Sequence, residues 1–167
     1  GAGESGKSTL VKQIKRLYCD GFTPYDRKSF KDVINISIIA DFQTLVDSMI
    51  EGAYKYSNDI EPSVHAVKEI DHSDSIDADI AELFLEIWDD PAMKMVYSES
   101  KSLGIAENFE YFMDKIHDFV EPDYLPSDLD ILKARIRSLG ISDMKLMIND
   151  IKTVIVDIGG QKSQRKR

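Results

Sequence analysis

The first eight residues, GAGESGKS, constrain the fold more than any other part of the sequence. They match the pattern G-x-x-x-x-G-K-[ST] at every fixed position. Its glycines let the backbone wrap closely around a phosphate, and the helix that follows adds its partial positive charge. Lys7 would then reach the β- and γ-phosphates of a nucleotide, and the Ser8 hydroxyl would bind Mg²⁺. The alternative interpretation is a glycine-rich turn at the start of a helix.

The net charge makes such a local site the expected way to bind an anion. The chain has 30 acidic and 21 basic side chains, a net charge of -9, which argues against a general affinity for nucleic acid or anionic membranes. With 43% hydrophobic residues in 167, it can bury a sizeable core. We find no signal peptide and no apolar stretch long enough to span a bilayer, and the single Cys19 cannot form an internal disulfide. A reducing intracellular compartment is therefore expected.

Apolar residues in the middle of the chain recur at helical spacing and predict an all-helical unit of about a hundred residues. A long helix is expected from about 29 to 50, and the polar segment 54–77 is either a loop or a short broken helix. One broad face of the long helix carries Phe30, Val33, Ile34, Phe42, Leu45, Val46 and Met49. Shorter amphipathic segments follow at 80–88, 93–97 and 109–119.

Beyond a linker that contains two prolines, the pattern changes to that of a sheet. Ser127-x-x-Asp130 resembles a helix cap, which predicts a short helix inside the linker. KLMIND and IKTVIVD meet at Asn149-Asp150, which predicts two strands joined by a tight hairpin. Because a phosphate loop normally follows a buried strand, we expect the chain to begin partway through a longer one.

The run TVIVDIGGQ carries a second group of candidate nucleotide-binding residues. Asp157 lies just beyond four β-favouring residues, where a strand-end carboxylate can hold Mg²⁺. Gly160 can offer an amide N–H to a γ-phosphate, and Gln161 has the donor and the acceptor needed to orient an attacking water. Alone, this short motif is equally well explained as a turn that closes a strand. After a phosphate loop, it favours nucleotide hydrolysis.

Taken in order, GAGESGKST, the long helical insertion, LKARIRSLGI and DIGGQKSQRKR resemble the corresponding segments of G-protein α subunits. Small Ras-like GTPases share the first and last motifs but lack an insertion of this length. The resemblance implies an α/β fold: a P-loop (Ras-like) GTPase domain fragment with an inserted all-helical domain. It places the P-loop and first helix at 1–22 and the helical domain at 23–127. Switch I, the hairpin and the start of switch II follow at 128–167.

The resemblance also implies catalytic roles. Arg135 would be the arginine finger that neutralises charge developing on the γ-phosphate and the leaving oxygen. G-protein α subunits are a known case of an arginine supplied in cis, so this role is carried over by resemblance. Ser138 would give Mg²⁺ a second hydroxyl while GTP is bound, and its release would relax the switch. A solvated basic face of Lys133, Arg135 and Arg137 is the alternative. The metal ligands implied are Ser8, Ser138 and Asp157.

Further contacts with the nucleotide are implied in the same way. Glu4 would pair with Arg135 in the inactive form, and Glu107 and Asn108 would approach from the helical side. A helix N-cap explains Asn108 equally well. The catalytic residues implied are Arg135 and Gln161. The nucleotide-binding residues implied are Gly3, Glu4, Ser5, Gly6, Lys7, Ser8, Thr9, Asn108, Leu132, Lys133, Arg135, Asp157 and Gly160.

The chain departs from the family pattern at two places. Threonine is usual at the Mg²⁺ position and at the next one, where this chain has Ser138 and Leu139. Serine keeps the oxygen but loses the methyl group that restricts its rotamer, so we expect a less firmly ordered switch. Gln164 replaces the family's usual acidic residue, which removes a partner from the active-state ion pairing.

The function implied is a GTP-binding and GTP-hydrolysing switch, with Mg²⁺ as cofactor and GTP or GDP as ligand. Its partners would be a G-protein βγ dimer, a membrane receptor, an effector and a regulator of G-protein signalling, and no nucleic acid. It would act at the cytoplasmic face of the plasma membrane, with no anchor in this chain. The alternatives are a nucleotide-gated interaction module without turnover and a P-loop kinase with a helical lid. The kinase would need an acceptor site and further lid arginines.

Overall fold

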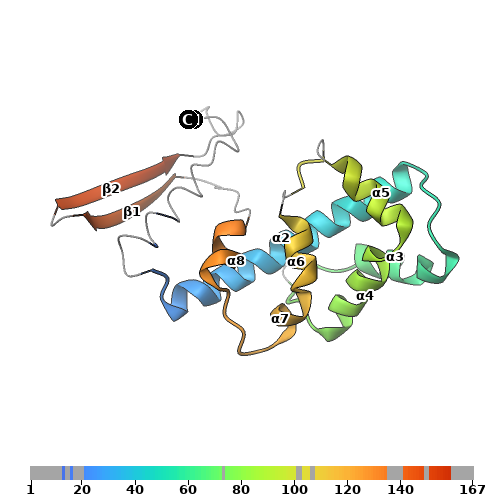
Figure 1. Cartoon of the computed structure of the whole chain (residues 1–167), viewed down its shortest axis with the longest axis horizontal. Helices are drawn as coiled ribbons and strands as arrows, with labels where there is room; N and C mark the ends of the chain where they lie inside the picture. Colours follow the sequence, from blue (N-terminus) through green and yellow to red (C-terminus); the bar gives the residue numbers. More distant parts are fainter. Residues whose placement is uncertain are drawn as a thin grey trace. The chain divides into compact units, whose positions relative to one another are not determined.

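The chain divides into two compact units. The computed structural model describes residues 13, 16, 21–72, 74–100, 103–105, 108–134, 141–148 and 151–158. One unit comprises 31–124, and the other combines 1–30 with 125–167. In the described residues the first unit is helical, whereas the second holds the start of a long helix, a short helix and a two-stranded sheet (Figure 1). The predicted domain boundaries at 22 and 127 stay a prediction.

The long helix α2, Pro24–Glu51, begins five residues earlier than predicted. Thr23 and Asp26 form a reciprocal cap: the Thr23 backbone N–H donates to Asp26 Oδ2 at 2.9 Å, and the Asp26 N–H donates to Thr23 Oγ1 at 3.2 Å. Pro24 suits the first helical position because its φ is preset and it has no N–H to satisfy. The sequence TPYD therefore marks the start of α2, which apolar periodicity alone did not reveal.

One face of α2 supplies the core of the helical unit. Its buried residues are Ile34, Asn35, Ile38, Ile39, Asp41, Phe42, Leu45, Val46 and Met49. The prediction that Val33 belongs to this face was wrong, since Val33 is 37% exposed. The buried face is broad enough to hold adjacent pairs such as Ile38 and Ile39, and Val33 lies at its exposed edge. The remaining predicted core positions from Ile34 to Met49 are buried, as expected.

By length and composition alone, α2 is long and apolar enough to cross a membrane, which our sequence reading did not anticipate. Half of its most apolar window is buried against the rest of the unit. A helix at the core of a folded unit meets the same criterion, because the apolar residues of its buried face raise the mean hydropathy of the helix. We therefore interpret α2 as a packing element of the unit.

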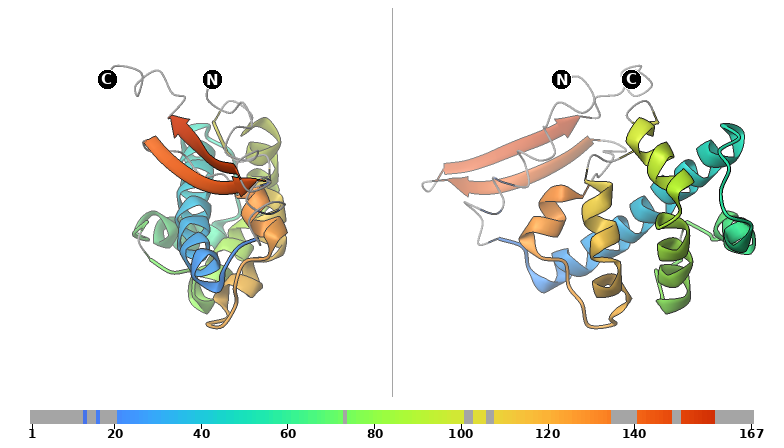
Figure 2. Two further views of the ribbon diagram at one scale, coloured as in Figure 1. Left: turned by 90° about the vertical axis from the view of Figure 1, so that its left-hand side faces the viewer. Right: turned by 45° about the vertical axis from the view of Figure 1, so that its right-hand side comes forward.

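Short helices gather around the part of α2 that follows residue 31 (Figures 1 and 2). They are η1 Asn58–Ile60, α3 Glu61–Lys68, α4 Ala78–Trp88, α5 Pro91–Glu99, α6 Phe109–Asp114 and α7 Ile116–Val120. Residues 54–77, for which the sequence allowed either a loop or a short broken helix, thus contain the two short helices η1 and α3. Asp77 and Asp90 cap α4 and α5, since their carboxylates accept from Ile80 N–H and Ala92 N–H.

Aromatic rings join these helices to α2. The Phe42 and Phe84 rings stack with centroids 4.2 Å apart, and Phe42 lies 6.2 Å from Phe109. The Trp88 ring meets Phe109 edge-on at 5.6 Å, and Trp88 is only 5% exposed. Large rings bury much apolar surface and prefer offset or edge-on contacts, so this cluster is a main source of the unit's stability. Trp88 is therefore part of the core of this unit.

The hairpin is confirmed and is longer than predicted. Strands β1 Ile141–Ile148 and β2 Ile151–Ile158 are antiparallel, with Ile148 opposite Ile151. This register leaves a connection of two residues, as the Asn149-Asp150 signal indicates. Strand β1 begins at Ile141 instead of Lys145, because its pairing with β2 continues to the Ile141–Ile158 pair across the polar Ser142-Asp143, which the apolar pattern did not indicate as strand.

Candidate functional site

Most residues of the predicted nucleotide site lie outside the described part of the chain, and their roles stay predictions. These are Gly3, Glu4, Ser5, Gly6, Lys7, Ser8, Thr9, Glu107, Arg135, Ser138, Gly160 and Gln161. The structure describes Asn108, Leu132 and Lys133, and the backbone of Asp157. The structure therefore describes the helices and the strand that carry these four residues, and not the rest of the predicted site.

Helix α8, Asp128–Lys133, carries two of the predicted nucleotide-binding residues at its C-terminal end. The predicted cap is confirmed as a capping box: Ser127 N–H donates to Asp130 Oδ2 at 2.6 Å, and Asp130 N–H donates to Ser127 Oγ at 3.2 Å. Asp130 and Ile131 are fully buried and fix the rotation of the helix. Leu132 and Lys133 are half-buried. Arg135 follows two positions after α8 ends.

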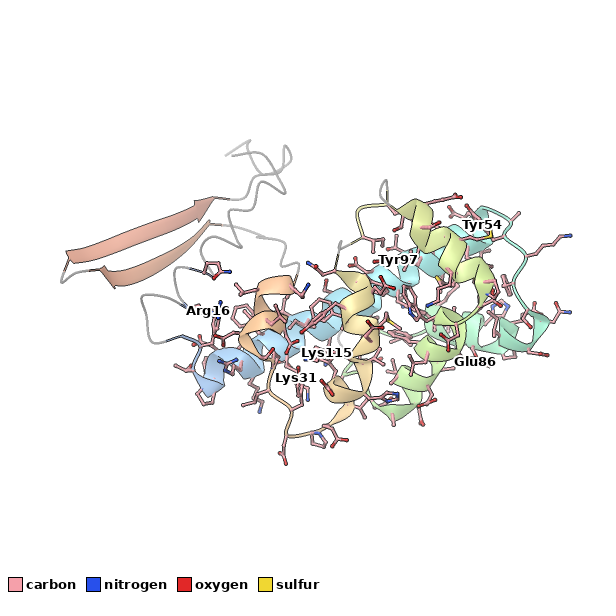
Figure 3. The ribbon with its side chains drawn as sticks, in the orientation of Figure 1. Arg16, Lys31, Tyr54, Glu86, Tyr97 and Lys115 are labelled. Carbon is pink, nitrogen blue, oxygen red and sulfur yellow. The ribbon has the colours of Figure 1, made fainter. Side chains whose placement is uncertain are left out.

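The first turn of α8 is held by two arginines. Asp128 Oδ1 accepts from Arg27 Nη2 at 2.5 Å, and its Oδ2 accepts from Arg16 Nε at 3.2 Å. Arg27 also donates through Nη1 to the Pro126 carbonyl oxygen at 2.6 Å. Figure 3 labels Arg16, whose side chain makes the second of these contacts. We call this cluster of Arg16, Arg27, Pro126 and Asp128 the Asp128 junction.

Sequence reasoning did not find the Asp128 junction. Arg27 and Asp128 are about a hundred positions apart, and neither belongs to a short motif. The one available signal was an acidic residue in the first turn of a capped helix, which is common because it suits the helix dipole. Only the fold brings its arginine partners to it.

Asp157 lies within β2, opposite Ser142 of β1. We had placed it just beyond the strand, but pairing continues to Ile158. The position remains one residue from the end of the strand. The role of Asp157 as a Mg²⁺ ligand stays a prediction.

Asn108 precedes α6 in the helical unit and is half-buried. Asn108 occupies the N-cap position of α6, but its side chain makes no capping hydrogen bond to that helix, so the capping alternative does not explain this residue. Glu110 N–H, in the first turn of α6, instead donates to the Tyr97 hydroxyl of α5 at 3.4 Å. Burial raises the pKa of Tyr97 above its ordinary value, which keeps that hydroxyl protonated. The nucleotide-binding role of Asn108 stays a prediction.

Comparison with known proteins extends these observations to the whole chain. The family model of the G-protein alpha subunit matches residues 1–167. The guanine nucleotide-binding protein subunit alpha of Coprinellus congregatus is 29% identical over 170 residues, covering 100% of this chain and 48% of that protein. The alpha-2 subunit of Caenorhabditis briggsae is 31% identical over 175 residues, covering 100% and 49%. The chain thus spans about half the length of the curated relatives that it matches.

The matched residues include the predicted phosphate loop, the helical unit, α8 and the hairpin. The capping box before Arg135 and the antiparallel hairpin before Gly160 are the two sequence-predicted supports of the site that the structure confirms. The chain belongs to the G-protein α subunit family.

Proposed function

We propose that this chain is the part of a G-protein α subunit that binds GTP, hydrolyses it and signals the difference between GTP and GDP. The observation that carries the proposal is the family match along all 167 residues, which contain the phosphate loop, Arg135 and Gln161 in the expected order. The fold proposed is a Ras-like GTPase domain with an inserted helical domain. The described helical unit and hairpin support it.

The proposed metal ligands suit Mg²⁺ by their chemistry. Ser8 and Ser138 offer hydroxyl oxygens and Asp157 offers a carboxylate, and hard oxygen donors are the ligands that Mg²⁺ prefers. Bound Mg²⁺ would supply positive charge to the β- and γ-phosphate oxygens. Lys7 and the amides of the phosphate loop would hold the same phosphates from the protein side.

In the proposed reaction, Gln161 orients a water molecule in line with the γ-phosphorus. The water oxygen forms a bond to that phosphorus while the bond to the β–γ bridging oxygen breaks, giving GDP and phosphate, and the protons of the water pass to phosphate and solvent. Arg135 and Lys7 stabilise the charge that moves to the bridging oxygen. Positioning and electrostatics therefore account for the catalysis.

The partners proposed follow from the family. A βγ dimer would bind the GDP state and an effector the GTP state, with a membrane receptor promoting exchange and a regulator promoting hydrolysis. This places the protein at the cytoplasmic face of the plasma membrane. The switch region around Ser138 would be the element that distinguishes the two states.

The test is single-turnover release of phosphate from GTP and from ATP with Mg²⁺, using the complete natural protein. Arg135→Ala and Gln161→Leu are each expected to slow release from GTP by at least about 100-fold. Arg137→Ala is the matched control, since it removes an arginine from the same segment that has no assigned role, and it should leave the rate unchanged.

Two results would count against this function. Binding of GTP without release would favour a docking module that is gated by nucleotide. Transfer of phosphate to a small-molecule acceptor would favour a kinase. A release rate insensitive to both Arg135→Ala and Gln161→Leu would remove those residues from the mechanism.

A further inference from the structure

The Asp128 junction joins three parts of the chain that are distant in sequence. Arg16 is helical and lies nine positions after Lys7 of the phosphate loop. Arg27 lies in the first turn of α2, and Asp128 is the first residue of α8. Each oxygen of the Asp128 carboxylate receives one arginine. The junction therefore links the helix after the phosphate loop to the helix that leads to Arg135.

Arg27 is more buried than the arginine of a typical surface ion pair and contacts several groups. Its side chain is 23% exposed and that of Asp128 is 34% exposed. Two of its nitrogens bond different groups, the Asp128 carboxylate and the Pro126 carbonyl, so the planar guanidinium fixes both the loop and the first turn of α8. Its guanidinium carbon also lies 5.9 Å from the centre of the Phe22 ring. Arg16, 46% exposed, is the weaker partner.

We propose that Asp128, held by Arg27 and Arg16, is a positioning residue for Arg135. The inference rests on the proposed function, in which Arg135 meets the phosphates bound by the loop. The short helix α8 has only two turns, so its direction depends on its capping box and on this junction. When the junction is removed, Arg135 samples a wider range of positions, and small displacements of a catalytic group are costly to the rate.

The direction of the effect follows from this arrangement. Loss of the Asp128 charge slows hydrolysis and speeds release of GDP. The reason is that the segment carrying Arg135 is then no longer linked to the helix that follows the phosphate loop. Because the junction is partly exposed, salt weakens it. The wild-type rate therefore falls as ionic strength rises, and an Asp128→Asn variant loses that dependence.

The experiment uses the complete natural protein and measures single-turnover phosphate release and GDP dissociation for Asp128→Asn, Arg27→Gln and the double variant. We expect release about tenfold slower in each single variant and little further loss in the double variant, since both single changes remove the Arg27–Asp128 ion pair, the stronger of the two pairs of the junction. Asp128→Glu keeps the carboxylate and is expected to retain a rate within about threefold of wild type. Far-ultraviolet circular dichroism and thermal unfolding verify that each variant folds.

Lys31→Gln is the matched control. Lys31, labelled in Figure 3, lies one turn after Arg27 in α2 and donates to the Glu121 carbonyl oxygen at 2.7 Å. Lys31→Gln removes a positive charge and a hydrogen bond to a backbone carbonyl, as Arg27→Gln does. A general effect of such a loss on the structure would therefore appear in this variant too. We expect its hydrolysis rate and salt dependence to match those of wild type.

The outcomes separate the inference from the function beneath it. If the wild type hydrolyses GTP and the folded Asp128→Asn and Arg27→Gln variants do so at the same rate, the positioning role of Asp128 is refuted and the proposed function stands. Equal slowing in Lys31→Gln, or slowing in Asp128→Glu as large as in Asp128→Asn, also refutes that role. Absence of GTP hydrolysis in the wild type overturns the proposed function, and with it the inference. Slowing confined to the junction variants, with the salt dependence lost, supports both.

Discussion

Replacing Phe42 with alanine should remove the centre of the helical unit's core. The Phe42 side chain is fully buried, its ring stacks on Phe84 at 4.2 Å, and it lies 6.2 Å from Phe109. No small shift of one helix can refill that space, because partners from two other helices, α4 and α6, line it. The cavity should therefore persist in the variant.

The expected loss can be worked from these contacts. Truncation of a buried phenylalanine to alanine costs about 3–5 kcal/mol, including the cavity. The stacked ring pair accounts for about 0.5–1.5 kcal/mol of that total, which puts this site in the upper part of the range. We expect a decrease of about 4–5 kcal/mol in the free energy of unfolding. Since a domain is typically stable by about 5–15 kcal/mol, the variant should be close to unfolding at room temperature.

Trp88 offers the assay, because it is the only tryptophan and is buried in the same cluster. Urea unfolding followed by its fluorescence gives the change in the free energy of unfolding of the unit. Met95→Ala is the control: Met95 is 54% exposed, and its replacement should change stability by at most about 0.5 kcal/mol. A cost below about 2 kcal/mol for Phe42→Ala would refute the placement of this ring at the centre of the core.

Three smaller predictions concern single polar groups. Asn35 Oδ1 is buried without a hydrogen bond among the described residues, so Asn35→Leu should raise the free energy of unfolding by about 1–2 kcal/mol in the same urea assay. The Tyr54 hydroxyl donates to Glu99 at 2.7 Å, which raises its pKa, so Glu99→Gln should lower that pKa towards about 10 in an ultraviolet titration read against Tyr54→Phe. The stability from this bond is complete below the ordinary pKa and is lost as pH rises through the raised value. Ser127→Ala should cost about 1 kcal/mol in thermal unfolding, whereas a neutral result would argue against the capping box.

Local signals in the sequence predicted much of this fold. The apolar repeat from Ile34 to Met49 identified the buried face of α2, and Asn149-Asp150 identified the hairpin. The Ser127-x-x-Asp130 pattern identified the start of α8. Each of these features depends on residues that are close in the chain, so a single sequence contains the information.

What the sequence could not supply depends on contacts between distant residues. The Asp128 junction, and the capping of α6 by Tyr97 in place of Asn108, need the helices to be packed first. Val33 was assigned to the buried face because it is apolar and fits the repeat, yet it is 37% exposed, since the position of the covering helices decides how far that face extends. The catalytic roles came from resemblance to a family, and the structure of the described residues does not test them.

The ring contacts of Phe42 also set an order of assembly. Helix α2 leaves the ribosome before Phe109 is synthesised, and the helices between them are too short to be stable alone in water. The emerging chain must therefore wait with one apolar face of α2 uncovered until α4 and α6 arrive. During that interval α2 is a natural target for holding chaperones, and slow translation of the segment between α2 and α6 would prolong the risk of aggregation.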